Sequence, residues 1–372
     1  MAVVAASVTV TTALPVDPAL PGLAAIRAQG LARAMPALAL GDRPVDLRLC
    51  SHAPGSRATF EVRAGDRRFA IKLYADDAAP EAELYGALTR AGLGGDRGRG
   101  ARVPRLLTWE RDLGVLALGW LEGRPANELI KNGQGVRAGE LAASWLRRAA
   151  ALPVRLGPPC GVGRMLYQAG VSVAALSSVD PGLGAAARAA ARSLGREQPS
   201  EGAPHLVHGT LYARHILDLG DGPGVIDWQQ FGQGPLELDG GMFLATISRL
   251  ALRHPSCAGE VARAEQAFLS GTSGLLHERT LEWYRAAGLL HLAARGLKTG
   301  QKRHPPPEAR ALVDEAARRN ADRTTWAETV VDSEVPRDGP ALELVLQALA
   351  TRPATAEELD QIRRLLDASA HR

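Results

Sequence analysis

The order of hydrophobic and polar positions predicts strands in the first third of the chain. Two runs, Ala58 to Val62 and Arg68 to Tyr74, alternate as strands do and are separated by a glycine-containing turn, which predicts a hairpin. The run from Val115 to Trp120 predicts a further strand, and the glycine- and arginine-rich stretch from Gly92 to Arg102 predicts a loop. Ahead of the strands, residues 17–45 carry a short helical pattern bounded by prolines, which predicts a leader helix.

From Asn127 onward, the spacing of apolar residues is mostly typical of helices. Apolar residues recur at three- and four-residue spacing in one segment before that point and in three segments after it: Pro80 to Gly92, Leu281 to Leu297, Glu308 to Arg319 and Ala341 to Leu366. One short hairpin, formed by His215 to Leu219 and Gly224 to Asp227, interrupts the helices. A strand-rich part followed by a helical part indicates an α+β fold.

Composition and charge narrow the classes of function. With 372 residues, 46% of them hydrophobic, the chain is long enough for a substantial core. Its net charge of +4 comes from basic residues scattered singly or in pairs without interleaved aromatic residues, so we expect no nucleic-acid partner. The three cysteines are far apart, and the chain shows neither a signal-peptide pattern nor an apolar run of about 18 residues. We therefore expect a cytoplasmic protein without membrane contact.

Three short motifs carry candidate chemistry. Lys72, one of only four lysines beside forty arginines, stands inside a predicted strand. The loop His208-Gly-Thr-Leu-Tyr-Ala-Arg-His-Ile-Leu217 is followed, after a turn, by Gly224-Val-Ile-Asp-Trp228. Together they resemble the aminoglycoside phosphotransferase and choline kinase family, in which the loop reads His-Gly-Asp-Leu-His-x-x-Asn. The resemblance extends from about Leu47 to Leu297.

This resemblance implies a two-lobed, protein-kinase-like α+β fold with a small antiparallel-sheet N-lobe and a mostly helical C-lobe. In that layout, residues 1–46 form an N-terminal extension with a short helix, and residues 47–120 form the N-lobe with its nucleotide-binding elements. Residues 121–340 form the helical C-lobe with the catalytic-type loop, and residues 341–372 form a C-terminal helical tail. The implied ligands are ATP, or another nucleoside triphosphate, and magnesium.

By the same resemblance, Lys72 is expected to bind the α and β phosphates, because kinases place a compact ammonium on their third strand for this purpose. Glu81, at the start of the next helix, is expected to hold it, with Glu83 as the second choice. The alternative is that Lys72 lies on the solvent face of an amphipathic strand.

Gly55 and Ser56 are the candidate residues of a nucleotide-covering loop. They lie within Ser51 to Phe60, the expected connection between the first two strands. Their backbone amides are suited to phosphate, but an ordinary hairpin turn needs the same residues, so both interpretations stand.

Asp227 matches the family's metal-binding aspartate, since it follows two β-branched residues and precedes a tryptophan. A hard cation such as magnesium prefers carboxylate oxygen and bridges the phosphates. An aspartate that stabilises a turn is the simpler alternative. His215 occupies the position of the asparagine that binds a second magnesium in the family, and a neutral imidazole suits zinc or manganese better.

Thr210 occupies the position of the family's catalytic base. A threonine hydroxyl carries no negative charge near neutral pH, and general-base assistance is worth about 10² to 10⁴ in rate. His208 is expected to brace the loop, with a role as substitute base as the alternative. Arg214 would contact a phosphate or a substrate carboxylate, or face the solvent. Asp239 resembles the aspartate that braces the loop from the following helix.

We therefore expect a nucleotide-binding protein of the kinase fold that is catalytically impaired, because Thr210 and His215 replace the usual aspartate and asparagine. One alternative is an active ATP-dependent phosphotransferase that acts on a small hydroxyl or amine substrate with His215 or His208 as its base. Another is an interaction scaffold without a ligand. The expected partners are the nucleotide and either a small-molecule acceptor or a protein.

Overall fold

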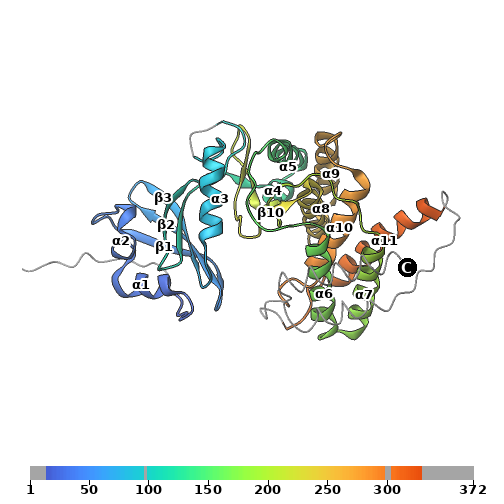
Figure 1. The fold of residues 1–372 in the computed structure, drawn as a ribbon, viewed down its shortest axis with the longest axis horizontal. Helices are drawn as coiled ribbons and strands as arrows, with labels where there is room; N and C mark the ends of the chain where they lie inside the picture. Colours follow the sequence, from blue (N-terminus) through green and yellow to red (C-terminus); the bar gives the residue numbers. More distant parts are fainter. Residues whose placement is uncertain (1–13, 96–98, 298–302, 329–372) are drawn as a thin grey trace, which may run out of the picture. The chain divides into compact units, whose positions relative to one another are not determined.

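The structure is a computed structural model that describes residues 14–95, 99–297 and 303–328 (Figure 1). It divides into two compact units. Unit 1 takes in Met1–Ala126, Ala151–Gly157 and Arg214–Gln229, and unit 2 takes in Asn127–Ala150, Pro158–Ala213 and Gln230–Arg372. The domain boundaries expected at residues 46, 120 and 340 remain predictions. The helix expected at 341–366 lies outside the described residues.

Unit 1 is built on a five-stranded antiparallel sheet. Its strands, in spatial order, are β1 (Val45–Ala53), β2 (Arg57–Ala64), β3 (Arg67–Tyr74), β5 (Val115–Gly119) and β4 (Leu106–Glu110). The β2–β3 hairpin confirms the alternating pattern, and β5 confirms the strand predicted from Val115 to Trp120. A strand before Ser51 was implied only by the expected connection between the first two strands, and β4 was not predicted. Each of β1 and β4 contains a register shift that interrupts its alternation.

One face of this sheet is covered by the N-terminal helical segments. Phe69, Ile71 and Leu73 of β3 pack there with buried residues of α1 (Pro21–Gln29), α2 (Leu31–Ala34) and the 3₁₀ helix η1 (Pro36–Leu38). The predicted leader helix is thus present as three short pieces. Gly30 separates the first two and Pro36 opens the third, because neither residue favours a helix interior.

The other face of the sheet carries Lys72, since successive side chains of a strand point to opposite faces. Helix α3 (Ala79–Arg90) packs on this face, where Ala78 and Ala82 meet Leu116 of β5. The helix has Pro80 in its first turn and is followed by Gly92 at φ +81°, in agreement with the predicted start and stop.

The connection between β1 and β2 is shorter than predicted. The stretch Ser51 to Phe60 was expected to be a loop, but β1 continues to Ala53 and β2 begins at Arg57, which leaves a three-residue turn. The sequence conceals these strand ends because most of their side chains are polar or exposed. Gly55, in the middle of the turn, has φ +73°, a backbone conformation that favours glycine.

A second, three-stranded sheet also belongs to unit 1, in the order β6 (Arg124–Pro125), β8 (Ile216–Asp218) and β9 (Pro223–Val225). The β8–β9 pair confirms the hairpin predicted near residues 215–227. Strand β9 ends two residues before Asp227. The aspartate therefore lies in the segment that leaves the hairpin.

Unit 2 consists mainly of helices. They are α4 (Ala126–Lys131), α5 (Gly135–Ala150), α6 (Val162–Ser177), α7 (Pro181–Arg196), α8 (Leu236–Arg253), α9 (Ala258–Gly271), α10 (Glu278–Ala293) and α11 (Ala309–Glu328). Helices α10 and α11 correspond to two of the predicted helical segments. A two-stranded sheet joins β7 (His205–Val207) and β10 (Gly232–Gly234). Helices α8 and α10 approach closely at Gly241, where a Cβ would lie 2.5 Å from the backbone nitrogen of Arg285.

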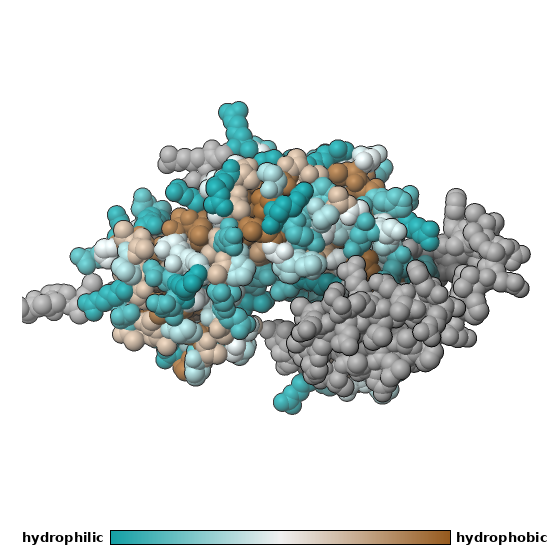
Figure 2. Space-filling view, in the orientation of Figure 1, coloured by the Kyte–Doolittle hydropathy of each residue, from teal (hydrophilic) through white to brown (hydrophobic). Residues whose placement is uncertain are grey.

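Hydrophilic residues dominate the face seen in Figure 2, with hydrophobic residues in small patches. The large hydrophobic side chains that are exposed in the described parts, such as Val136, Val179 and Leu252, are far apart in the sequence. Within those parts, no helix has both the length and the apolar character needed to cross a membrane.

Leu23 provides a test of how α1 is held on the sheet. The side chain is fully buried in the cluster that includes Ile71 and Leu73. We expect Leu23→Ala to lower the free energy of unfolding by about 2 to 5 kcal/mol, because it removes buried methyl groups and leaves a cavity. Urea denaturation measures the change. Val16→Ala is the control, because Val16 is 74% exposed, and a loss in Leu23→Ala no larger than in this control would contradict the packing described.

Candidate active site

The candidate site in unit 1 is organised around the ammonium of Lys72. Its Nζ donates hydrogen bonds to Oε1 of Glu81 and to Oδ1 of Asp227, each at 2.9 Å. Strand β3 supplies the lysine, the first turn of α3 supplies Glu81, and the segment after β9 supplies Asp227. Lys72 and Asp227, the two residues on which the kinase-like hypothesis depends, are therefore in direct contact. Glu81 rather than Glu83 is the partner of Lys72.

Two further residues extend this cluster. Tyr74, two positions after Lys72 on the same face of β3, donates a 2.5 Å hydrogen bond to Oε2 of Glu81. Gln229, two positions after Asp227, donates from Nε2 to the Tyr74 hydroxyl at 2.9 Å. The sequence-based hypothesis did not include either residue. The period of two along β3 was a signal for Tyr74, whereas nothing local to Gln229 indicated its partner.

Burial and neighbouring charge act in opposite directions on the pKa of Lys72, which is only 6% exposed. Burial alone would lower its pKa, but the negative charge of Glu81, with contributions from Tyr74 and Asp227, outweighs it and raises the pKa well above the ordinary value. Lys72 therefore stays protonated across the physiological range. A fixed positive charge of this kind suits an anionic ligand.

Asp227 is held in an uncommon backbone conformation. Its φ of +72° lies in the left-handed region, which non-glycine residues occupy at a cost of about 1 to 3 kcal/mol. Its carboxylate is 38% exposed, and Nε2 of the buried His215 lies 3.4 Å from its Oδ2. The structure thus brings His215 and Asp227 together.

The donors around Asp227 partly fit a magnesium ion. One accessible carboxylate is sufficient for a cation that takes its remaining ligands from phosphates and water. The imidazole of His215 is a poor ligand for so hard an ion. In the parts of the chain that are described, no three His, Cys, Asp or Glu side chains lie together as a metal cluster would require.

Gly55 and Ser56 lie in the turn between β1 and β2, and both are exposed. The amide of Gly55 donates a 2.9 Å hydrogen bond to Oδ2 of Asp17, and the carbonyl of Ser56 accepts one from Ala75. The Gly55 amide therefore already has an anionic partner within the chain. Sequence reasoning missed Asp17.

Thr210 and its neighbours form a second group, in unit 2. The backbone amides of His208 and Gly209 donate to the carboxylate of Asp239 at 2.7 and 2.9 Å, as expected for a bracing residue. His208 is fully buried, and its Nδ1 lies 3.4 Å from the amide and 3.5 Å from the hydroxyl oxygen of Thr210. Gly209 has φ +76°, and a Cβ there would lie 2.0 Å from the carbonyl oxygen of Gln230. The loop therefore keeps the brace of a catalytic loop while presenting a hydroxyl at residue 210.

Arg214 lies in the 3₁₀ turn η2 (Ala213–His215), and its side chain is exposed. The structure assigns this turn to unit 1 from Arg214 onward. Whether the guanidinium binds a phosphate or a substrate carboxylate remains a prediction.

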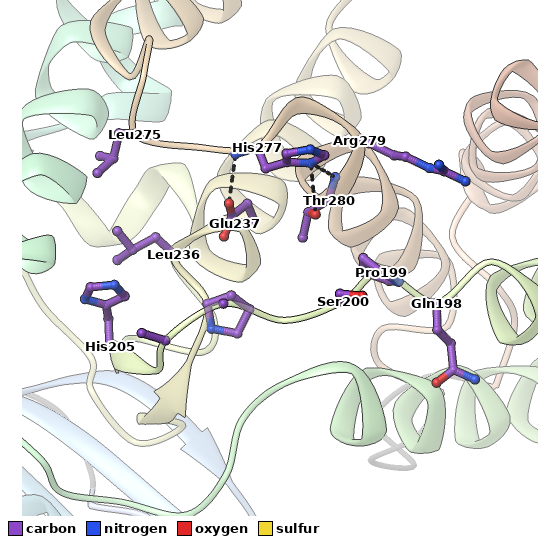
Figure 3. A pocket seen from close by; sticks show the side chains of 13 residues that line it. Gln198, Pro199, Ser200, His205, Leu236, Glu237, Leu275, His277, Arg279 and Thr280 are labelled. Carbon is purple, nitrogen blue, oxygen red and sulfur yellow. Dashed lines mark hydrogen bonds between the residues drawn. The ribbon is translucent and has the colours of Figure 1, made fainter. Parts of the chain in front are cut away.

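Unit 2 also contains a cavity of about 660 Å³ (Figure 3). Its walls come from the loop before β7, from the start of α8 and from the start of α10, and they include His205, Glu237 and Arg279. Glu237 accepts a 2.8 Å hydrogen bond from the amide of His277, as Figure 3 shows. None of the candidate residues named from the sequence lines this cavity.

An antiparallel sheet that carries a lysine–glutamate pair, followed by a helical part that contains a braced His-Gly-x loop, defines a protein-kinase-like α+β protein of the small-molecule phosphotransferase type. Residues 51–284, more than half of the chain, match the model of the phosphotransferase enzyme family. The chain belongs to this family, which bears out the resemblance seen in its motifs.

Solved structures support the same fold. A thermostable mutant of aminoglycoside phosphotransferase APH(4)-Ia, in a ternary complex with ADP and hygromycin B, superposes with a TM-score of 0.53 at 17% identity, covering 75% of this chain and 95% of its own. Choline kinase LicA from Streptococcus pneumoniae gives 0.52 at 11% identity, with coverages of 74% and 93%. An ethanolamine kinase from Plasmodium vivax gives 0.50 at 12% identity, with coverages of 74% and 82%. The search of curated proteins found no match.

The brace at Asp239 makes a prediction about pH. Burial raises the pKa of Asp239 to about 7, although hydrogen bonds from the amides of His208 and Gly209 oppose the rise. Between its ordinary value and pH 7, the folded chain keeps a proton that the unfolded chain releases, so stability falls as the pH rises. From pH 5 to pH 7.5 we expect this group to remove about 2 to 3 kcal/mol of unfolding free energy.

Urea denaturation of the wild type and of Asp239→Asn at both pH values measures this contribution. The variant lacks the titrating group. The difference between wild type and variant in the change of unfolding free energy from pH 5 to pH 7.5 therefore isolates the contribution of Asp239. An equal change in both proteins would show that Asp239 is ionised throughout this range.

Proposed function

We propose that this chain binds ATP, or another nucleoside triphosphate, through Lys72 and Asp227, and that it transfers phosphate poorly. The observation that supports this proposal is the convergence of Glu81 and Asp227 on the Lys72 ammonium, each at 2.9 Å. The ADP, AMP-PNP or AMP bound in several solved relatives supports a nucleotide as the ligand.

In this proposal the residues of unit 1 bind and orient the polyphosphate. Lys72 supplies a permanent positive charge to the phosphate oxygens, and Glu81 together with Tyr74 fixes the direction of the ammonium. Asp227 would hold a magnesium ion, which bridges the phosphates and offsets their charge when it is bound.

Impaired transfer follows from the side chain at residue 210. A carboxylate at this position would accept the proton of an attacking hydroxyl, and the hydroxyl of Thr210 is not basic enough to do so. Nucleotide positioning would remain, because it depends on other residues. The expected result is a protein that binds nucleotide with little turnover.

Nucleotide binding can be tested by thermal shift with ATP and magnesium. We expect ATP at about 100 times its Kd to stabilise the wild type by about 2.7 kcal/mol, which raises the Tm by several degrees. Lys72→Ala should abolish the shift relative to its own ligand-free Tm. Lys131→Ala is the matched control, since Lys131 lies on α4 and pairs with Glu128 one helical turn away. No shift in the wild type, or an equal shift in Lys72→Ala, excludes nucleotide binding at this site.

A second candidate function is active phosphotransfer to a small hydroxyl or amine substrate. The observation that favours it is the imidazole of His215, whose Nε2 lies 3.4 Å from Asp227 and which is a candidate base. In this alternative, His215 accepts the proton of the attacking group as the γ-phosphoryl moves from ATP to the acceptor and ADP leaves.

Transfer of labelled phosphate from ATP to water and to a panel of hydroxyl and amine acceptors separates the two functions. If transfer is impaired for lack of a carboxylate, Thr210→Asp should raise the rate by about 10² to 10⁴ over the wild type. If His215 is the base, the wild type should turn over and His215→Gln should lose a similar factor. Asp227→Ala in the Thr210→Asp background is the control and should remove the gained activity.

A further inference from the structure

Asp17, just before α1, is bound to the turn between β1 and β2. Its carboxylate accepts hydrogen bonds from the amide of Gly55 at 2.9 Å, from Nε2 of His52 at 2.9 Å and from the amide of Ala19 at 3.2 Å. Asp17 is only 8% exposed, and it precedes the segment that matches the phosphotransferase family, which begins at residue 51. This contact is therefore made by the chain's own N-terminal extension.

The turn held by Asp17 lies at the end of the sheet that carries the candidate site. Arg57, the first residue of β2, pairs with Tyr74, and Thr59 pairs with Lys72. At about 3.3 Å per strand residue, the turn is roughly 10 Å along the strand from the position opposite Lys72. The amide of Ala75, next to Tyr74, donates to the carbonyl of Ser56 at 2.9 Å.

A continuous set of contacts therefore leads from Asp17 to the lysine. Asp17 holds the Gly55 amide, and the adjoining Ser56 carbonyl holds the end of β3. Tyr74, at that end, donates to the Glu81 carboxylate, whose other oxygen accepts from Lys72. These bonds provide a route by which a displacement of the turn would change the surroundings of the ammonium.

Asp17 is suited to restrain the turn because its own position is fixed. Leu20 and Leu23, which follow it, are fully buried against the sheet face opposite Lys72. Besides Asp17, backbone hydrogen bonds at Ser56 restrain the turn, since its amide donates to the carbonyl of Ala53 and its carbonyl accepts from Ala75. Gly55 itself is exposed, and nothing lies within 4 Å of the position of a Cβ there. An anchored carboxylate thus holds an exposed glycine turn.

We propose that Asp17 is a positioning residue that fixes the β1–β2 turn, and through Tyr74 the Lys72–Glu81 pair, in the geometry that receives a polyphosphate. The inference rests on the proposed nucleotide-binding function and adds a residue outside the family segment to it. Asp17 does not itself touch the ligand in this proposal. Its effect is confined to the part of the nucleotide that Lys72 contacts.

Calorimetric titration with ATP and magnesium, and separately with adenosine, tests this role. We expect Asp17→Ala to bind ATP roughly five- to tenfold more weakly, which corresponds to the net contribution of about one ordinary hydrogen bond. Adenosine affinity should change less than twofold, because adenosine lacks the phosphates. Asp17→Asn keeps an acceptor for the Gly55 amide and should lose less than Asp17→Ala. Asp42→Ala, which removes an exposed carboxylate from the same unit, should match the wild type.

The outcomes separate this inference from the proposed function. If the wild type does not bind ATP, or if Lys72→Ala binds it equally well, both fail. If the wild type binds through Lys72 but Asp17→Ala binds ATP as tightly or more tightly, only the positioning role is overturned, and a tighter complex would identify Asp17 as a competitor of phosphate. An equal loss for ATP and adenosine would reduce Asp17 to a structural residue. Circular dichroism at the titration temperature confirms that each variant is folded.

Discussion

Burial of the Lys72 ammonium is the constraint on which the arrangement of unit 1 depends. A charged group removed from water is costly unless anions and hydrogen bonds replace the solvent. Glu81 and Asp227 do so from two separate segments, and Asp227 is 155 residues away from Lys72 in the sequence. The need to satisfy one cation therefore fixes how α3 and the β8–β9 hairpin lie against β3. Both elements therefore help to satisfy a buried charge in addition to packing against apolar residues.

The same interaction sets a condition on the ligand proposed for this site. A polyphosphate that approaches Lys72 also approaches the carboxylate of Asp227, so attraction and repulsion act together. A divalent cation on Asp227 would remove the repulsion and bridge the phosphates. In the proposed function, the short distance between lysine and aspartate would thus couple metal binding to nucleotide binding. His215, buried beside Asp227, would add a nitrogen ligand and so alter which cation the proposed site prefers.

The sequence was most informative where local pattern and structure coincide. Alternation predicted β2 and β3 and placed Lys72 on the face opposite Ile71, an apolar run predicted β5, and helical spacing with Pro80 predicted α3. The register shifts inside β1 and β4 disrupt the period that such reasoning uses. The pairing of Lys72 with Glu81 was predicted from the resemblance to the kinase family and not from local periodicity. In contrast, the roles of Gln229 and Asp17 depend on contacts between segments distant in sequence, which no local pattern encodes.

The loop around Thr210 shows why fold and activity are separable in this chain. Its conformation is determined by backbone amides bound to Asp239, by the close approach of Gly209 to Gln230, and by the amide of Ala213, which donates to Thr246. None of these interactions uses the side chain of residue 210. A threonine can therefore stand where the family has an aspartate without loss of the loop's brace. The motif remains recognisable because these backbone restraints persist, whereas proton transfer, in the proposed function, would depend on one side chain that they do not constrain.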